Sequence, residues 1–152
     1  MKPRLNPYQA APEAMKTVAA LETYVQKCGV EPGLIELIKT RASQINGCAY
    51  CLHMHTADAR AKGESEERLY LLDAWRESPL YTDRERAALA WTEAVTLVAD
   101  SRVPDQVYEE ARRHFSETEM VNLTVAVGAI NMWNRIAISF RAVHPTKQAR
   151  AA

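Results

Sequence analysis

Apolar residues recur along most of this chain at the three- and four-residue spacing of amphipathic helices. No stretch alternates with the period of two that is typical of a half-buried strand, and no glycine-rich phosphate loop is present. Proline, glycine and capping residues divide the pattern into separate segments. We therefore predict an all-α fold, a compact bundle of about six or seven helices, near residues 12–28, 32–46, 48–62, 65–75, 82–98, 104–115 and 116–140.

Local signals fix several of these helix ends. Thr82 with Glu85, and Ser116 with Glu119, have the spacing of capping boxes, in which both side chains bind backbone N–H groups at a helix start. The last helix is apolar on almost every side. We expect it to be buried, either at the centre of the bundle or between subunits.

Composition narrows the class of protein. The chain has 152 residues, 47% of them hydrophobic, and its 19 basic and 19 acidic side chains give zero formal net charge. We predict one globular domain over residues 1–152, with an extended arm at 1–10 and a polar tail at 144–152. No basic stripe indicates a nucleic-acid partner, and no polybasic or sufficiently long apolar helix indicates a membrane.

The three cysteines do not form a disulfide framework, and the first residues have no apolar signal region, so we expect a reducing cytoplasm. Candidate chemistry is concentrated in the run Cys48-Ala49-Tyr50-Cys51-Leu52-His53-Met54-His55. On a helix, Cys48, Cys51 and His55 share one face, whereas His53 points elsewhere. The helix start favours a thiolate at Cys48, and His55 is placed to take the proton of Cys51. This arrangement favours thiol redox chemistry.

Two other interpretations of the same residues remain open. Cys-x2-Cys-x3-His offers three zinc ligands, and Cys28 or His53 would have to supply a fourth at an unusual spacing. Alternatively, the cysteines are inert packing residues, which is what we expect of Cys28 itself. The pattern alone places Glu36 on a solvated face, paired with Lys39.

The chain also resembles a known family. Glu36, followed twelve residues later by Cys48-x2-Cys51-x3-His55, is similar to the signature of the AhpD-like alkylhydroperoxidases of the carboxymuconolactone decarboxylase superfamily. The flanking run 39–51, the run 84–95 and the later run 131–135 are similar to that family as well. The resemblance covers roughly residues 10 to 143.

The resemblance implies an all-helical subunit that assembles into dimers, trimers or hexamers and reduces hydroperoxides. By position, Cys51 is the peroxidatic thiol, Cys48 forms a disulfide with it, and His55 and Glu36 relay protons. A dithiol reductant, of the lipoyl type in related members, is the expected partner, and exchange is expected to begin at the more accessible sulfur, Cys48. No cofactor or resident metal is expected. Tyr50 departs from the family pattern, because the best-known members have a histidine there.

Two further functions compete with a peroxidase. The lyase branch of the superfamily decarboxylates a small lactone acid, a reaction that needs no cysteine pair. A non-enzymatic metal-binding module would be built around Cys48, Cys51 and His55.

Overall fold

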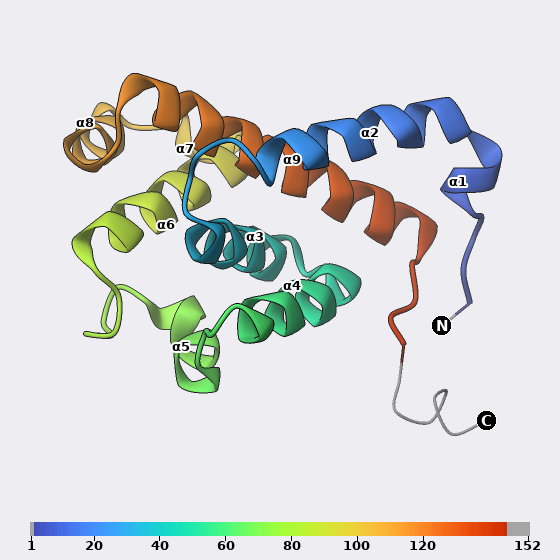
Figure 1. The fold of residues 1–152 in the computed structure, drawn as a ribbon, viewed down its shortest axis with the longest axis horizontal. Coiled ribbons are helices and arrows are strands. Elements are labelled where there is room, and N and C mark those ends of the chain that lie inside the picture. Colours follow the sequence, from blue (N-terminus) through green and yellow to red (C-terminus); the bar gives the residue numbers. More distant parts are fainter. Residues whose placement is uncertain (1, 146–152) are drawn as a thin grey trace.

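The computed structural model describes residues 2–145, and these residues form helices and no strands. The predicted all-α class is therefore confirmed. Figure 1 shows the arrangement of the helices. Their bounds are α1 Pro7–Ala10, α2 Pro12–Val25, α3 Pro32–Asn46, α4 Ala49–Ala61, α5 Glu66–Leu71 followed by a 3₁₀ turn Leu72–Ala74, α6 Asp83–Thr96, α7 Val98–Ser101, α8 Asp105–His114 and α9 Glu117–Phe140.

The longer helices are the ones that the sequence pattern predicts. Those of ten or more residues are α2, α3, α4, α6, α8 and α9, and α5 makes a seventh. The four-residue helices α1 and α7 were not anticipated, because a single turn contains too few apolar positions to show a period. No helix in the described part of the chain has the length and apolar character needed to cross a membrane.

Helix α3 occupies the centre of the fold and packs against α4, α6 and α9 (Figure 1). It is buried at every residue from 34 to 40. The main core lies where Ile38 of α3 meets Ala88 of α6 and Leu123 and Val127 of α9, all of them fully buried. Helical periodicity predicts one buried face, but a central helix with neighbours on several sides has no solvated face.

Helix α9 is buried on one side only in the single chain, and its burial between subunits stays a prediction. One of its sides is buried in the core, but Val121, Met132 and Ile138 are exposed on the single chain. Its buried side also contains asparagines. Asn131 and Asn134 both accept hydrogen bonds from the Asn46 side chain, at 3.0 and 2.8 Å, and this joins the end of α3 to α9.

The N-terminal segment is not the fully extended arm that we expected, because Pro7–Ala10 form α1. Asn6 caps this turn by accepting a hydrogen bond from the backbone N–H of Tyr8 at 3.0 Å. Before it, the backbone N–H of Arg4 donates to the carbonyl of Phe140 at 3.0 Å. The arm is therefore tied to the end of α9. Met1 and most of the expected polar tail, residues 146–152, lie outside the described residues.

Candidate active site

The cysteine pair lies at the tight connection between α3 and α4. Gly47 has φ of 67°, in the left-handed region that glycine adopts without strain, and it ends α3. Cys48 is the N-cap of α4, one residue before the first helical residue, and its sulfur accepts a hydrogen bond from the backbone N–H of Cys51 at 3.4 Å. The two cysteines are joined as a disulfide, with their Cα atoms 5.4 Å apart. The structure thus brings together the two sulfurs that the spacing predicts to be neighbours.

The two sulfurs differ in what they face. Cys48 and Cys51 are both buried, at 1% and 2% exposure, and they pack with Ala42 and Ile130. A pocket lies between α2, α3, α4 and α9. Of the two cysteines, Cys51 lines this pocket and Cys48 does not. Our expectation that Cys48 is the more accessible sulfur is therefore wrong, because Cys51, and not Cys48, lines the pocket.

Glu36 is buried, at 5% exposure, and it binds two side chains from the α4 segment. Its Oε2 lies 2.9 Å from Nδ1 of His55, and its Oε1 accepts a hydrogen bond from Nζ of Lys62 at 2.5 Å. The pattern-based interpretation of Glu36 as a solvated partner of Lys39 is wrong, because α4 packs across this face of α3. The structure places Glu36 beside His55, as the resemblance implies.

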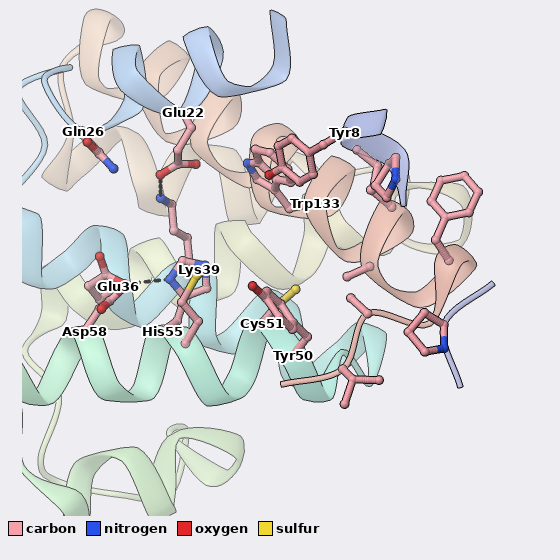
Figure 2. Close-up of a pocket in the computed structure, with 18 of the residues that line it drawn as sticks. Tyr8, Glu22, Gln26, Glu36, Lys39, Tyr50, Cys51, His55, Asp58 and Trp133 are labelled. Carbon is pink, nitrogen blue, oxygen red and sulfur yellow. Dashed lines mark hydrogen bonds and ion pairs between the residues drawn. The ribbon is translucent and has the colours of Figure 1, made fainter. Parts of the chain in front are cut away.

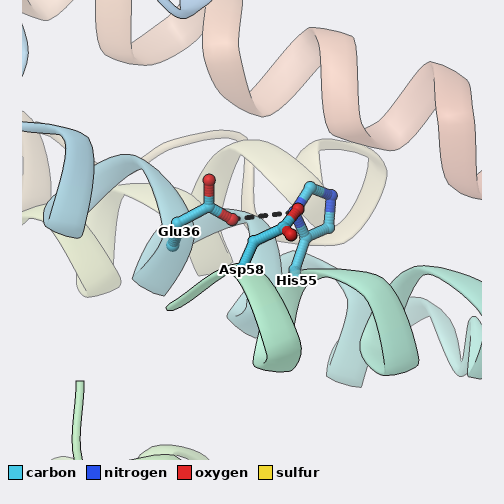
Figure 3. Close-up of side chains that lie close together, drawn as sticks. All are labelled: Glu36, His55 and Asp58. Carbon is cyan, nitrogen blue, oxygen red and sulfur yellow. Dashed lines mark hydrogen bonds and ion pairs between the residues drawn. The ribbon is translucent and has the colours of Figure 1, made fainter. Parts of the chain in front are cut away.

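The electrostatics of this group determine which nitrogen carries the proton. Burial raises the pKa of the Glu36 carboxyl, but hydrogen bonds from His55 and Lys62 outweigh this effect. The pKa of Glu36 therefore lies below its usual value of 4.5. An ionised carboxylate only accepts hydrogen bonds, so Nδ1 of His55 must be the donor. The other ring nitrogen, Nε2, is then an acceptor in the neutral imidazole. Figure 3 shows Nε2 on the side of the ring away from Glu36.

A second charge pair, part-buried, was missed by sequence reasoning. Lys39 has a side chain only 2% exposed, and its ammonium forms an ion pair with Glu22 of α2. One signal was present, because Glu22 falls in register with the apolar residues Met15, Val18 and Val25 of its helix. A carboxylate on an apolar helix face needs a buried partner, but the sequence does not show which cation supplies it.

These groups surround one pocket with a volume of about 450 Å³. It lies between α2, α3, α4 and α9, and residues before α1 and after α9 also line it. In Figure 2 the charged side chains gather at the left of the view, and Cys51, Tyr8 and Trp133 lie to their right. The pocket therefore has a charged part and an apolar part, and Cys51 belongs to its wall.

The structure also bears on the metal-site interpretation. Among the described residues, the group of side chains that could hold an ion is Glu36, His55 and Asp58, whose ligand atoms all lie within 4.8 Å of one another. This group contains neither cysteine, and the Lys62 ammonium already occupies one Glu36 oxygen. The Cys-Cys-His set proposed for zinc is not assembled, since the two sulfurs are bonded to each other.

The other residues singled out by the sequence lie at the edge of this site or outside it. Tyr50 is partly exposed and lines the pocket. His53 is exposed and stacks on His144, with ring centroids 4.8 Å apart. Cys28 is a free, half-buried cysteine that packs against the main core, as expected of a packing residue.

Comparison with known proteins identifies the family. Residues 12–94 match the sequence model of the carboxymuconolactone decarboxylase family. The uncharacterised protein YdfG of Bacillus subtilis is 45% identical over 139 residues, which cover 91% of this chain and 95% of YdfG. The chain belongs to the carboxymuconolactone decarboxylase family.

Solved structures place it on the AhpD-like side of that family. ATU0492 of Agrobacterium tumefaciens, a protein of unknown function described as a candidate antioxidant defence protein AhpD, superposes with a TM-score of 0.94. It is 53% identical, and the match covers 96% of this chain and all of that one. A peroxidase-related protein from Silicibacter sp. TM1040 shares the fold, with a TM-score of 0.79 and 24% identity over 93% of this chain and 75% of that protein.

Proposed function

We propose that this protein is a thiol-dependent peroxidase that reduces hydroperoxides with the Cys48–Cys51 pair. The observation that carries the proposal is a single arrangement: Cys51 lines the pocket with a second sulfur in bonding reach, and one turn further along α4 His55 is held by the ionised Glu36. This supplies a nucleophile, a resolving thiol and an oriented base on adjacent helices.

The chemical steps follow from these positions. Nε2 of His55 takes the proton of Cys51, and the thiolate attacks the terminal oxygen of the hydroperoxide, so that the O–O bond breaks. Cys51 becomes a sulfenic acid, and the departing alkoxide takes from His55 the proton that came from Cys51 and becomes an alcohol. The Cys48 thiol then displaces the sulfenic hydroxyl as water and forms the disulfide. Glu36 keeps Nδ1 of His55 protonated and so keeps Nε2 free for these transfers.

A dithiol must restore the reduced pair, and we propose a lipoyl-type or similar small dithiol. Two of its thiols become one disulfide, so that the whole cycle converts a hydroperoxide and a dithiol into an alcohol, water and a disulfide. Exchange begins at Cys51, the sulfur that faces the pocket. A reducing compartment such as the cytoplasm suits this cycle. We also propose a homo-oligomer, in which a second copy covers the exposed apolar residues of α9.

The lyase activity after which the family is named is less well supported. Decarboxylation of a lactone acid needs no sulfur, whereas this pocket has a cysteine in its wall and a second one bonded to it. Nothing in the geometry favours the lyase over the peroxidase.

The test is peroxide turnover with a dithiol, measured for Cys51→Ser and Cys48→Ser, with Cys28→Ala as the matched control. Turnover should be lost in both site variants and kept in the control. Cys48→Ser should still consume one equivalent of peroxide and stop at the sulfenic acid, which a dimedone mass tag detects. Unchanged turnover in both site variants would rule the proposal out.

A further inference from the structure

The ion pair between Glu22 and Lys39 has unused hydrogen-bonding capacity in the wall of the pocket. Lys39 carries three N–H donors, and in the described part of the chain it makes one hydrogen bond, to Glu22 Oε1. Oε2 of Glu22 is buried and has no partner among the described residues. Both residues line the pocket that contains Cys51. One ion pair therefore presents a spare acceptor and spare donors side by side.

Such an arrangement is costly to the fold. Removing two charges from water is repaid only when their remaining hydrogen bonds are satisfied, and an apolar pair of similar size is often at least as stable. A second buried atom, Thr40 Oγ1, also has no partner within residues 2–145, but it belongs to a neutral hydroxyl and does not line the pocket. The charged and unsatisfied pair is thus found where a ligand can complete it.

The pair lies on the charged side of the pocket with the proton relay. Glu36 and Lys39 are neighbouring pocket residues on α3, one helical turn apart, and Glu36 binds His55. Figure 2 shows the Lys39 side chain reaching from α3 toward Glu22 beyond the His55 ring. A molecule that enters along the apolar wall would meet this pair with its polar end.

We propose that Glu22 and Lys39 bind and orient the peroxide group of an organic hydroperoxide, a role that rests on the proposed peroxidase function. A hydroperoxide has a donor and an acceptor on adjacent atoms, the O–H and the oxygen next to carbon. Oε2 of Glu22 accepts the O–H, and an N–H of Lys39 donates to the oxygen bonded to carbon. The apolar body of the substrate lies against Trp133 and Phe140.

This orientation assists cleavage of the O–O bond, the step in which negative charge develops on the departing oxygen. Cys51 attacks the oxygen that carries the hydrogen, and the electron pair of the O–O bond moves to the oxygen bonded to carbon. The Lys39 N–H stabilises the negative charge on that oxygen until the proton that His55 took from Cys51 converts it to the alcohol. The hydroxyl remains on sulfur as the sulfenic acid, so atoms and electrons balance without a further reactant.

The experiment compares two reactions of the reduced protein at neutral pH. The first is oxidation by cumene hydroperoxide, followed by intrinsic fluorescence, since Trp133 lines the pocket. The second is alkylation of Cys51 by iodoacetamide, which needs the thiolate but contains no peroxide group. The variants are Glu22→Gln, which replaces the spare acceptor by a donor, and the double variant Glu22→Leu/Lys39→Met. The control is the double variant Glu13→Leu/Lys16→Met, which removes an exposed ion pair from α2, the helix that bears Glu22.

Both pocket variants should slow peroxide oxidation by about 10- to 100-fold, while alkylation changes by less than about threefold. The control should leave both rates unchanged. Equal losses in both reactions would mean that the pair acts only on the thiolate or the fold, and unchanged rates would mean that it has no role. Either result overturns the inference and leaves the peroxidase standing.

Two further outcomes are distinguishable from these. If the wild type is alkylated but never oxidised by the peroxide, both the inference and the proposed peroxidase function fail. Should the double variant not fold, Glu22→Gln alone decides between the same outcomes, because it preserves the shape of the side chain.

Discussion

The buried Glu36 and the half-buried Glu93 share one electrostatic property and differ in their partners. For Glu36 and for Glu93 of α6, burial raises the pKa, and hydrogen bonds lower it further than burial raises it. Oε1 of Glu93 accepts hydrogen bonds at 2.8 Å from Nε of Arg41 and from the Trp75 indole, and Oε2 accepts one from Arg76 at 2.5 Å. Glu36 instead binds His55 and Lys62 beside the pocket.

The comparison shows why a shifted pKa does not by itself mark a functional residue. The guanidinium groups around Glu93 stay charged at any physiological pH and bind in a fixed geometry, so this carboxylate holds α3, α6 and the segment after α5 together. An imidazole, unlike a guanidinium, can transfer a proton at physiological pH, and His55 beside Glu36 lines the same pocket as Cys51, with which a proton can be exchanged. The identity of the partner and its access to a cavity separate the structural carboxylate from the one that we propose as part of a proton relay.

The largest effect is expected when the proposed proton relay is removed. His55→Gln keeps a side chain of similar size but provides no base for the Cys51 proton, and we expect the rate of cumene hydroperoxide reduction at pH 7 to fall by about 10²- to 10⁴-fold. Glu36→Gln should reduce the rate as well, because an amide can donate to Nδ1 and so favour the wrong tautomer. Glu93→Gln is the matched control and should react at close to the wild-type rate. A similar loss in all three variants would remove the distinction between the two carboxylates.

The second largest effect is on the free energy of unfolding, and here we expect the greater loss at Glu93 rather than at Glu36. Glu93→Gln leaves the charged hydrogen bonds from Arg41 and Arg76 without their anion, and we expect it to lower the free energy of unfolding by about 2 kcal/mol. Urea denaturation of the reduced protein measures this loss, and iodoacetamide alkylation of Cys51 checks that the site is intact. A stable Glu93→Gln variant with impaired thiol chemistry would contradict the assignment.

The sequence predicts local features of this protein better than features that depend on tertiary contacts. Both capping boxes, at Thr82 and at Ser116, are present as predicted, because all their atoms lie within four residues. The fold class and the one-turn spacing of the cysteines are local in the same sense.

Features that depend on helix packing were the ones missed. Glu36 was assigned to solvent, since nothing in its own helix indicates that α4 crosses over it. Lys39 and Glu22 are 17 residues apart, and their pairing requires the packed bundle. The family resemblance corrected the position of Glu36 but gave no indication of Glu22 or Lys39.

Acid unfolding gives a third test of the comparison. The pKa of each carboxyl is lower in the folded protein than the usual 4.5, so each contributes stability that is fully present above about pH 4.5 and is lost as the pH falls through the folded value. Glu36→Gln and Glu93→Gln should therefore each flatten the acid side of the curve of unfolding free energy against pH. A steeper acid loss in either variant would contradict the direction of the shift.

The smallest effect is expected at a carboxylate that belongs to neither site. In the capping box at the start of α9, the backbone N–H of Ser116 and the side chain of Arg84 hold the pKa of Glu119 at about 2. Glu119→Gln should cost about 1 kcal/mol of stability at pH 7, and the stabilisation in the wild type should disappear between pH 4.5 and about 2. Thermal melts across this range measure it, and peroxide reduction at pH 7 should not change.

The most direct test of the central claim is a thiol count on the reduced Cys28→Ala protein before and after one equivalent of cumene hydroperoxide. We predict that two free thiols become none and that peptide mapping finds Cys48 bonded to Cys51. If both thiols survive while the peroxide remains unconsumed, the pair is not a peroxidatic centre.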